Sequence, residues 1–268
     1  MSTSPAAKST VQAKQNDTFA SIAIIVCMIV GLVVYIIFGK VGLDAEGHPK
    51  PGNFLGIIYM GGFIVPLLMG LFLLTVVVSI ERFLTLGKAA GAGNVTELIR
   101  KVKASLSGGN NAAAIAECDK HKSSVANIIR STVEKYSDVE HDSHMDKDQK
   151  LAAIRAATEE ATALELPMLE KNLVILATMG SVATLIALLG TVIGMIKAFA
   201  ALATAGSPDP VKLANGISEA LINTALGIGT AAIAIVMYNV FTTKIDKMTY
   251  AVDEAGFSIA STFAEKHK

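Results

Sequence analysis

One acidic residue stands inside an apolar stretch, and it is the first candidate for chemistry. Residues 213–243 contain Glu219 as their only charged residue. A carboxylate within a membrane-spanning helix is costly, and it indicates a functional site such as an ion path. The alternatives are a structural hydrogen bond or an acid that reaches water at the helix end. A position about ten residues, or roughly 15 Å, past Asp209 argues against contact with water. At 100° per residue, one helix face holds Gly216, Glu219, Asn223, Gly227, Thr230 and Ala234, with Thr224 on an adjacent face.

A second apolar stretch, residues 172–205, carries a matching stripe of small and hydroxyl residues. Its members fall within an arc of roughly 80° on a helix, and they are Gly180, Thr184, Ala187, Thr191, Gly194 and Ala198. Such a stripe allows two helices to approach closely in lipid, and tight packing without transport is the alternative explanation. Lys197 is the only charge here. It is expected to extend to the membrane interface, or to form a salt bridge with Glu219 or with an acid of a partner.

Two further blocks, residues 18–39 and 51–80, contain no charged residue. A membrane span needs about 20 mostly apolar residues, and in lipid such spans are helices. Residues 18–39 end in Tyr35–Phe38 without a small-residue cleavage site, which predicts a retained anchor rather than a signal peptide. We therefore expect an all-α, polytopic membrane protein with four transmembrane helices. The last two should be very long and extend toward the cytoplasm, and a helical cytoplasmic loop should join the second to the third.

The expected segments follow from these blocks. They are an N-terminal tail (1–17), a first span (18–39), a periplasmic segment (40–60), a second span (61–86), a cytoplasmic helical loop (87–171), a third span (172–205), a periplasmic turn (206–212), a fourth span (213–243) and a C-terminal tail (244–268). Lys and Arg concentrate beside the tails and the loop, which predicts that both termini are cytoplasmic. Within the loop, Asn94, Ser123 and Asp146 are expected to cap helices, and Pro167 to kink or restart the last one. Asp209 with Pro210 should start the fourth span.

Composition excludes a disordered chain, a disulfide scaffold and an ordinary cytosolic enzyme. Charged residues make up 17% of the chain, against about a quarter in soluble domains, and hydrophobic residues make up 52%. The net charge of zero argues against nucleic acid as a partner. No enzyme site and no cofactor are expected. Cys118 and His121 lack a second pair of ligands for a metal, and Cys27 and Cys118 are not expected to form a disulfide.

The two stripes lie in motifs that resemble the TolQ/ExbB/MotA family of proton-channel motor subunits. The motifs are Leu188-Leu189-Gly190-Thr191-Val192-Ile193-Gly194-Met195-Ile196, then Gly216-Ile217-Ser218-Glu219-Ala220-Leu221-Ile222-Asn223-Thr224-Ala225-Leu226-Gly227, followed by Tyr238-Asn239-Val240-Phe241. Leu169-Glu170-Lys171-Asn172-Leu173 also looks like the family. The resemblance covers about residues 63–247. The acid in the second motif favours the ExbB and TolQ branch of the family over the MotA branch.

The resemblance implies a homopentamer around a dimer of a single-helix partner of the ExbD/TolR type, in a bacterial inner membrane. It also implies that energy passes to a TonB-type protein for uptake of iron complexes through outer-membrane receptors. Thr191 and Thr224 match the lining threonines of the family, and Glu219 matches its membrane acid. The expected proton path comprises Glu219, Thr191, Thr224, Thr184 and Asn223. Expected helix-packing positions are Gly180, Gly190, Gly194, Gly216 and Gly227, with Lys197 as an interface charge.

The chain departs from the family pattern at a few positions. Thr184 and Ile233 stand where the family often has Pro, and Ala187 where it has Gly. The additional N-terminal helix resembles forms found in Bacteroidota-type bacteria, and the sequence leaves its role open. Other roles also stay open: a TolQ-like subunit for envelope maintenance, a MotA-type stator, or a structural scaffold without ion conduction. Glu and Thr without further oxygen ligands favour protons over sodium ions.

Overall fold

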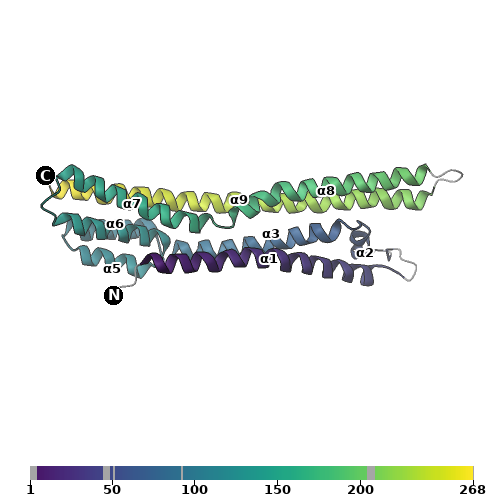
Figure 1. Ribbon diagram of the computed structural model, residues 1–268, viewed down its shortest axis with the longest axis horizontal. Helices are drawn as coiled ribbons and strands as arrows, with labels where there is room; N and C mark the ends of the chain where they lie inside the picture. Colours follow the sequence, from purple (N-terminus) through teal and green to yellow (C-terminus); the bar gives the residue numbers. More distant parts are fainter. Residues whose placement is uncertain (1–4, 45–48, 51, 92, 204–208, 268) are drawn as a thin grey trace. The chain divides into compact units, whose positions relative to one another are not determined.

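The computed structural model describes residues 5–44, 49–50, 52–91, 93–203 and 209–267, and these are almost entirely helical (Figure 1). This confirms the expected all-α fold. The helices are α1 (Pro5–Gly42), α2 (Phe54–Tyr59), α3 (Val65–Ala90), α4 (Val95–Ser107), α5 (Asn111–His121), α6 (Ser124–Glu140), α7 (Lys147–Glu170), α8 (Leu173–Leu202) and α9 (Pro210–Lys266).

Four helices among the described residues are long and apolar enough to cross a membrane: α1, α3, α8 and α9. The third and fourth of these are 30 and 57 residues long, against about 20 needed for one span. The second begins at Val65, because residues 54–64 form α2 and a turn instead of the start of the membrane helix. The chain is thus a multi-pass membrane protein, as its composition predicts.

Polar side chains cap the first turns of several helices, at the positions that the sequence predicts. Asn94, Ser123 and Asp146 each accept a hydrogen bond from a backbone N–H in the first turn of α4, α6 and α7. Asp209 Oδ1 accepts from the backbone N–H groups of Val211 and Lys212, both at 3.1 Å, and so opens α9 as expected. Ser207 and Pro208, also expected in that connection, lie outside the described residues.

Of the kink or restart expected at Pro167, the restart was wrong. Helix α7 runs through Pro167 and ends at Glu170. The chain then turns at Asn172, whose φ of 62° lies in the left-handed region that Asn tolerates better than most residues. Helix α8 begins at the next residue, Leu173, so the break depends on Asn172 and not on the proline.

The structure divides into two compact units, and the first comprises residues 1–80 and 174–238. Where α8 meets α9 in this unit, polar and apolar residues are distributed in the opposite way to those of a soluble domain. The interior between α8 and α9 is built from small and polar residues, such as Ala187, Ala198, Glu219 and Asn223, all less than 10% exposed. Large apolar residues lie outside, including Leu185, Val192, Leu221 and Ile228. Lipid tails are as apolar as Leu, so close helix contact rather than burial of large side chains holds such a unit together.

Helices α1 and α3 meet in this unit through glycine. A Cβ on Gly31 would lie 2.6 Å from the backbone nitrogen of Gly70 and 3.0 Å from the carbonyl oxygen of Pro66. Only hydrogen fits at that position, so the two backbones are in direct contact. This contact fixes α1 against the first half of α3.

The second unit comprises residues 81–173 and 239–268 and has an ordinary apolar core. Tyr136 of α6 meets Phe263 of α9 edge to face, with ring centroids 5.1 Å apart, and both side chains are fully buried. Lys266 Nζ lies 2.7 Å from Glu140 at the same end of the unit. Burial pushes the pKa of Glu140 upward, but hydrogen bonds from Lys266 and Asn111 outweigh it and hold this pKa below its ordinary value. The C-terminal part of α9 is therefore tied to α6 by both apolar and charged contacts.

Candidate functional site

Glu219 is buried and paired with Lys197. Its residue is 6% exposed, although it lies in the third turn of α9. Nζ of Lys197, from α8, lies 2.7 Å from Oε1 and 2.8 Å from Oε2. The Lys197 side chain is half exposed, and its Nζ lies 5.8 Å from the centre of the Phe63 ring. Of the two roles expected for Lys197, the structure shows the salt bridge to Glu219.

A glycine turn covers the other side of the carboxylate. Gly62 has a φ of +80°, and a Cβ at this position would overlap Oε1 of Glu219. One α9 turn further on, Nδ2 of the fully buried Asn223 donates to the carbonyl oxygen of Gly61 at 2.9 Å. The sequence reasoning placed Gly61 and Gly62 inside the second span and missed this role. The adjacent glycine pair in an apolar block was the available signal, because it marks a turn or a close approach.

Thr191 and Thr224 face each other across α8 and α9. Their hydroxyl oxygens are 2.5 Å apart. Oγ1 of Thr191 lies 3.0 Å from the carbonyl oxygen of Ala187, and Oγ1 of Thr224 lies 3.0 Å from that of Ala220. A hydroxyl has one hydrogen to donate and two lone pairs to accept with. The two hydroxyls can therefore exchange donor and acceptor roles by rotation alone.

The other expected residues take simpler positions. Thr184 donates to the carbonyl oxygen of Gly180 in its own helix, at 3.2 Å, and lies about two turns of α8 from Thr191. A Cβ on Gly194 would lie 2.7 Å from the backbone nitrogen of Ala220, and one on Gly216 would lie 2.7 Å from that of Ala198. Gly190, Gly227 and Gly180 face Asn223, Ala187 and Ile235 in the same way. All five glycines thus lie at the α8–α9 contact.

A vestibule opens beside Glu219. Its volume is about 490 Å³, and the residues that line it include Met60, Lys197, Ala201, Lys212, Asn215 and Glu219. It lies at the end of α8 and the start of α9, next to the Lys197–Glu219 pair. The carboxylate is thus covered by the glycine turn on one side and faces the vestibule, with Lys197 beside it, on the other.

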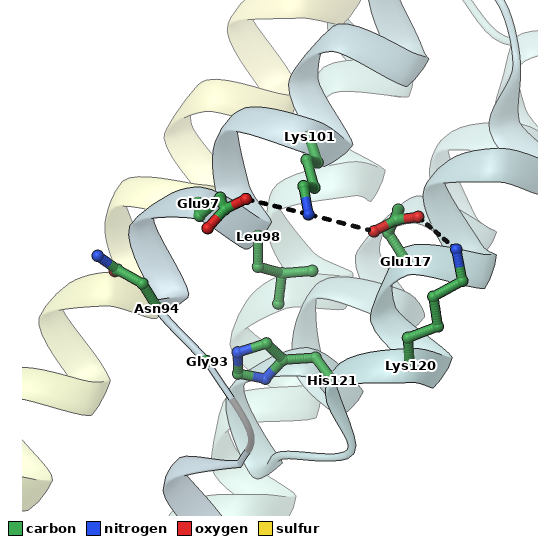
Figure 2. A pocket seen from close by; sticks show the side chains of 8 residues that line it. All are labelled: Gly93, Asn94, Glu97, Leu98, Lys101, Glu117, Lys120 and His121. Carbon is green, nitrogen blue, oxygen red and sulfur yellow. Dashed lines mark hydrogen bonds and ion pairs between the residues drawn. The ribbon is translucent and has the colours of Figure 1, made fainter.

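The second unit has a smaller hollow of about 200 Å³ between α4 and α5 (Figure 2). Its charged residues are paired with one another in a chain that runs from Glu97 through Lys101 and Glu117 to Lys120. His121 lies below them, with its Nδ1 2.9 Å from Oγ of Ser123. Burial raises the pKa of the neighbouring Cys118 thiol to about 12. The described residues contain no group of three His, Cys, Asp or Glu side chains that could hold a metal ion.

Comparisons with known proteins place this region in a family. The profile of the MotA/TolQ/ExbB proton channel family matches residues 120–254, which include both stripes. A Tol-Pal system protein TolQ from Pseudomonas aeruginosa is 33% identical over 126 residues, covering 47% of this chain and 54% of the relative. A biopolymer transport protein ExbB from Pseudomonas putida is 39% identical over 85 residues, covering 32% of this chain and 26% of the relative.

A putative ExbB homologue from Methanothermobacter thermautotrophicus is 27% identical over 195 residues, or 73% of this chain and 65% of the relative. The chain thus spans between about a quarter and two thirds of the length of these relatives, and their names do not favour ExbB over TolQ. The family match covers half of the chain and contains Glu219, Thr191 and Thr224. This chain, with its buried acid and facing hydroxyls, therefore belongs to the MotA/TolQ/ExbB proton channel family.

Proposed function

We propose that the chain is the proton-channel subunit of an inner-membrane motor that converts proton motive force into mechanical work. The observation that carries this proposal is Glu219, buried at 6% exposure on a helix whose outer face is apolar. A structural scaffold has no need for an acid at this position, because small residues alone hold α8 against α9. The family match supports the proposal, since the family is one of proton channels.

We propose a role in moving a proton for each of these residues, and their positions support it. The vestibule supplies water to the carboxylate of Glu219. A proton that binds there replaces the Lys197 ammonium as the partner of the carboxylate. Thr224 lies five residues further along α9, about 7.5 Å, and shares its hydroxyl with Thr191. A hydroxyl relays a proton when its oxygen accepts one on one side and releases its own hydrogen on the other; rotation then restores the first arrangement. We propose a proton rather than a sodium ion as the carried ion, because the family is one of proton channels.

The test of this path is removal of the hydroxyls. We expect Thr191→Val combined with Thr224→Val to lower proton flux at least about tenfold, the effect of about 1.4 kcal/mol on the barrier. Val keeps the shape of Thr but cannot donate or accept. The matched control is Thr178→Val, since Thr178 also donates to a backbone carbonyl of α8 but is exposed outside the stripe. Flux is measured in vesicles that contain the chain and its partner. Equal flux in the double variant and the control would contradict a role for this pair.

The assembly that we propose follows the family. The chain would form a homopentamer around a dimer of a single-helix partner of the ExbD/TolR type. Both termini and the second unit would lie in the cytoplasm, because Lys and Arg concentrate there. The order of spans, loop and tails expected from the sequence is kept in this proposal, with the second span beginning at Val65. The work would be delivered to a TonB-type protein for uptake of iron complexes.

A second candidate is envelope maintenance, because one relative is a Tol-Pal system protein TolQ. Deletion of the gene separates the two roles. The ExbB-like role predicts slow growth when iron is scarce, with normal resistance to detergent. Detergent sensitivity and periplasmic leakage with normal iron uptake would instead establish the TolQ-like role. Complementation with the intact gene is the control for both outcomes.

A further inference from the structure

Helix α1 is the element whose role the sequence left open, and its contacts lead to the Glu219 site. Tyr35 of α1 stacks on Tyr59, the last residue of α2, with ring centroids 4.6 Å apart and planes 18° apart. The Tyr35 hydroxyl donates to the carbonyl oxygen of Tyr59 at 3.3 Å. A Cβ on Gly39 would lie 2.9 Å from Cδ2 of the Tyr59 ring, so this ring lies directly on the α1 backbone. Tyr59 is therefore held by α1 on two sides.

Tyr59 in turn holds the glycine turn. Its carbonyl oxygen also accepts from the backbone N–H of Gly62 at 3.3 Å, and Gly61 donates to Ile58 at 3.0 Å. Gly61 and Gly62 are the residues that bind Asn223 and touch the carboxylate of Glu219. A continuous series of contacts thus runs from Tyr35 through Tyr59 and the turn to the acid. The direct backbone contact between Gly31 and Gly70 gives α1 a fixed position from which to act.

We propose that α1 is a positioning element of the Glu219 site: through Tyr35 and Tyr59 it holds the Gly61–Gly62 turn over the carboxylate. Access to Glu219 is thereby limited to the side of Lys197 and the vestibule. The functional meaning of this restriction rests on the proposed proton path, since a closed side prevents protons from leaking past the motor. The positioning role of α1 itself depends only on the contacts that α1 and the turn make.

The test measures how fast a hydrophobic carbodiimide modifies Glu219 in the full-length protein in proteoliposomes, by mass spectrometry of the peptide that contains it. We expect Tyr35→Leu to raise the modification rate about fivefold, the factor that loss of an aromatic pair of about 1 kcal/mol gives. Tyr35→Phe keeps the ring stack and should restore a rate near that of the wild type. Val33→Ala, at an exposed position of the same helix, is the matched control and should change nothing.

Two further variants test the same contacts if Tyr35→Leu does not fold. Gly39→Ala pushes on the Tyr59 ring, and Gly62→Ala displaces the turn itself; both should raise the rate. A raised rate in Gly62→Ala alone would overturn the role of α1 and leave the turn as the cover. Unchanged rates in all variants would overturn both. If rates rise as expected but Glu219→Gln conducts protons normally, the proposed function fails while the positioning role stands.

Discussion

Glu219→Gln should abolish the work of the motor. In the ExbB-like role proposed above, we expect uptake of iron complexes to fall at least about tenfold, because the amide cannot bind and release a proton. Gln has nearly the volume of Glu, so the cover of Gly62 and the packing of α8 on α9 are preserved. Lys197 loses its partner in this variant, but its side chain is half exposed and can turn to the vestibule.

The control for this variant is Glu254→Gln. It removes an equally charged residue from the same helix, at an exposed position in the second unit. We expect normal uptake from this control. Normal uptake from Glu219→Gln, with the protein present in the membrane at the usual level, would contradict a role for Glu219 in energy conversion.

The second large effect concerns the glycines between α8 and α9. We expect Gly216→Ala to destabilise the protein by about 1–3 kcal/mol, as overpacking does in other interiors. The added Cβ would lie 2.7 Å from the backbone nitrogen of Ala198 and 2.8 Å from the carbonyl oxygen of Gly194. Neither atom can move without shifting a helix. Thermal unfolding in detergent measures the change.

Gly229→Ala is the matched control, because it lies in the same helix with open space around the position of the added Cβ. There Ala should stabilise the helix by up to about 1 kcal/mol, since Gly has the poorer helix propensity. Opposite signs for the two substitutions identify helix contact as the cause. Equal effects would show that the α8–α9 approach is looser than the structure indicates.

Much of the fold and part of the site follow from local sequence signals. Asp209 and Pro210 predict the start of α9, since capping depends on residues within one turn. The 3.6-residue period places Thr191 on the stripe of α8 and Thr224 on the face next to the stripe of α9, and the structure brings their hydroxyls together. Pairing of the two stripes could be expected because small residues in lipid are typical of helix contacts.

Other features depend on contacts between residues distant in the sequence. Lys197 and Glu219 are 22 residues apart, so the sequence left open whether Lys197 reaches the interface or the acid. The sequence predicts membrane helix at Gly61 and Gly62. No residue close to them in the sequence indicates the carboxylate that their turn covers. The third span is expected to begin at residue 172, close to the observed start of α8, but the left-handed turn at Asn172 itself was not predicted, because Asn has a weaker sequence signal for a break than proline.

Proton flux is measured most directly in vesicles that contain this chain and the single-helix partner proposed for it. A pH-sensitive dye inside the vesicles reports the flux under an imposed membrane potential, with sodium-free and sodium-containing buffers compared. We expect proton entry at the same rate with and without sodium. In Glu219→Gln, we expect this rate to fall to that of vesicles with the partner alone. Wild-type flux no greater than that of the partner alone would contradict the proposed proton-channel role and leave the chain as a structural scaffold.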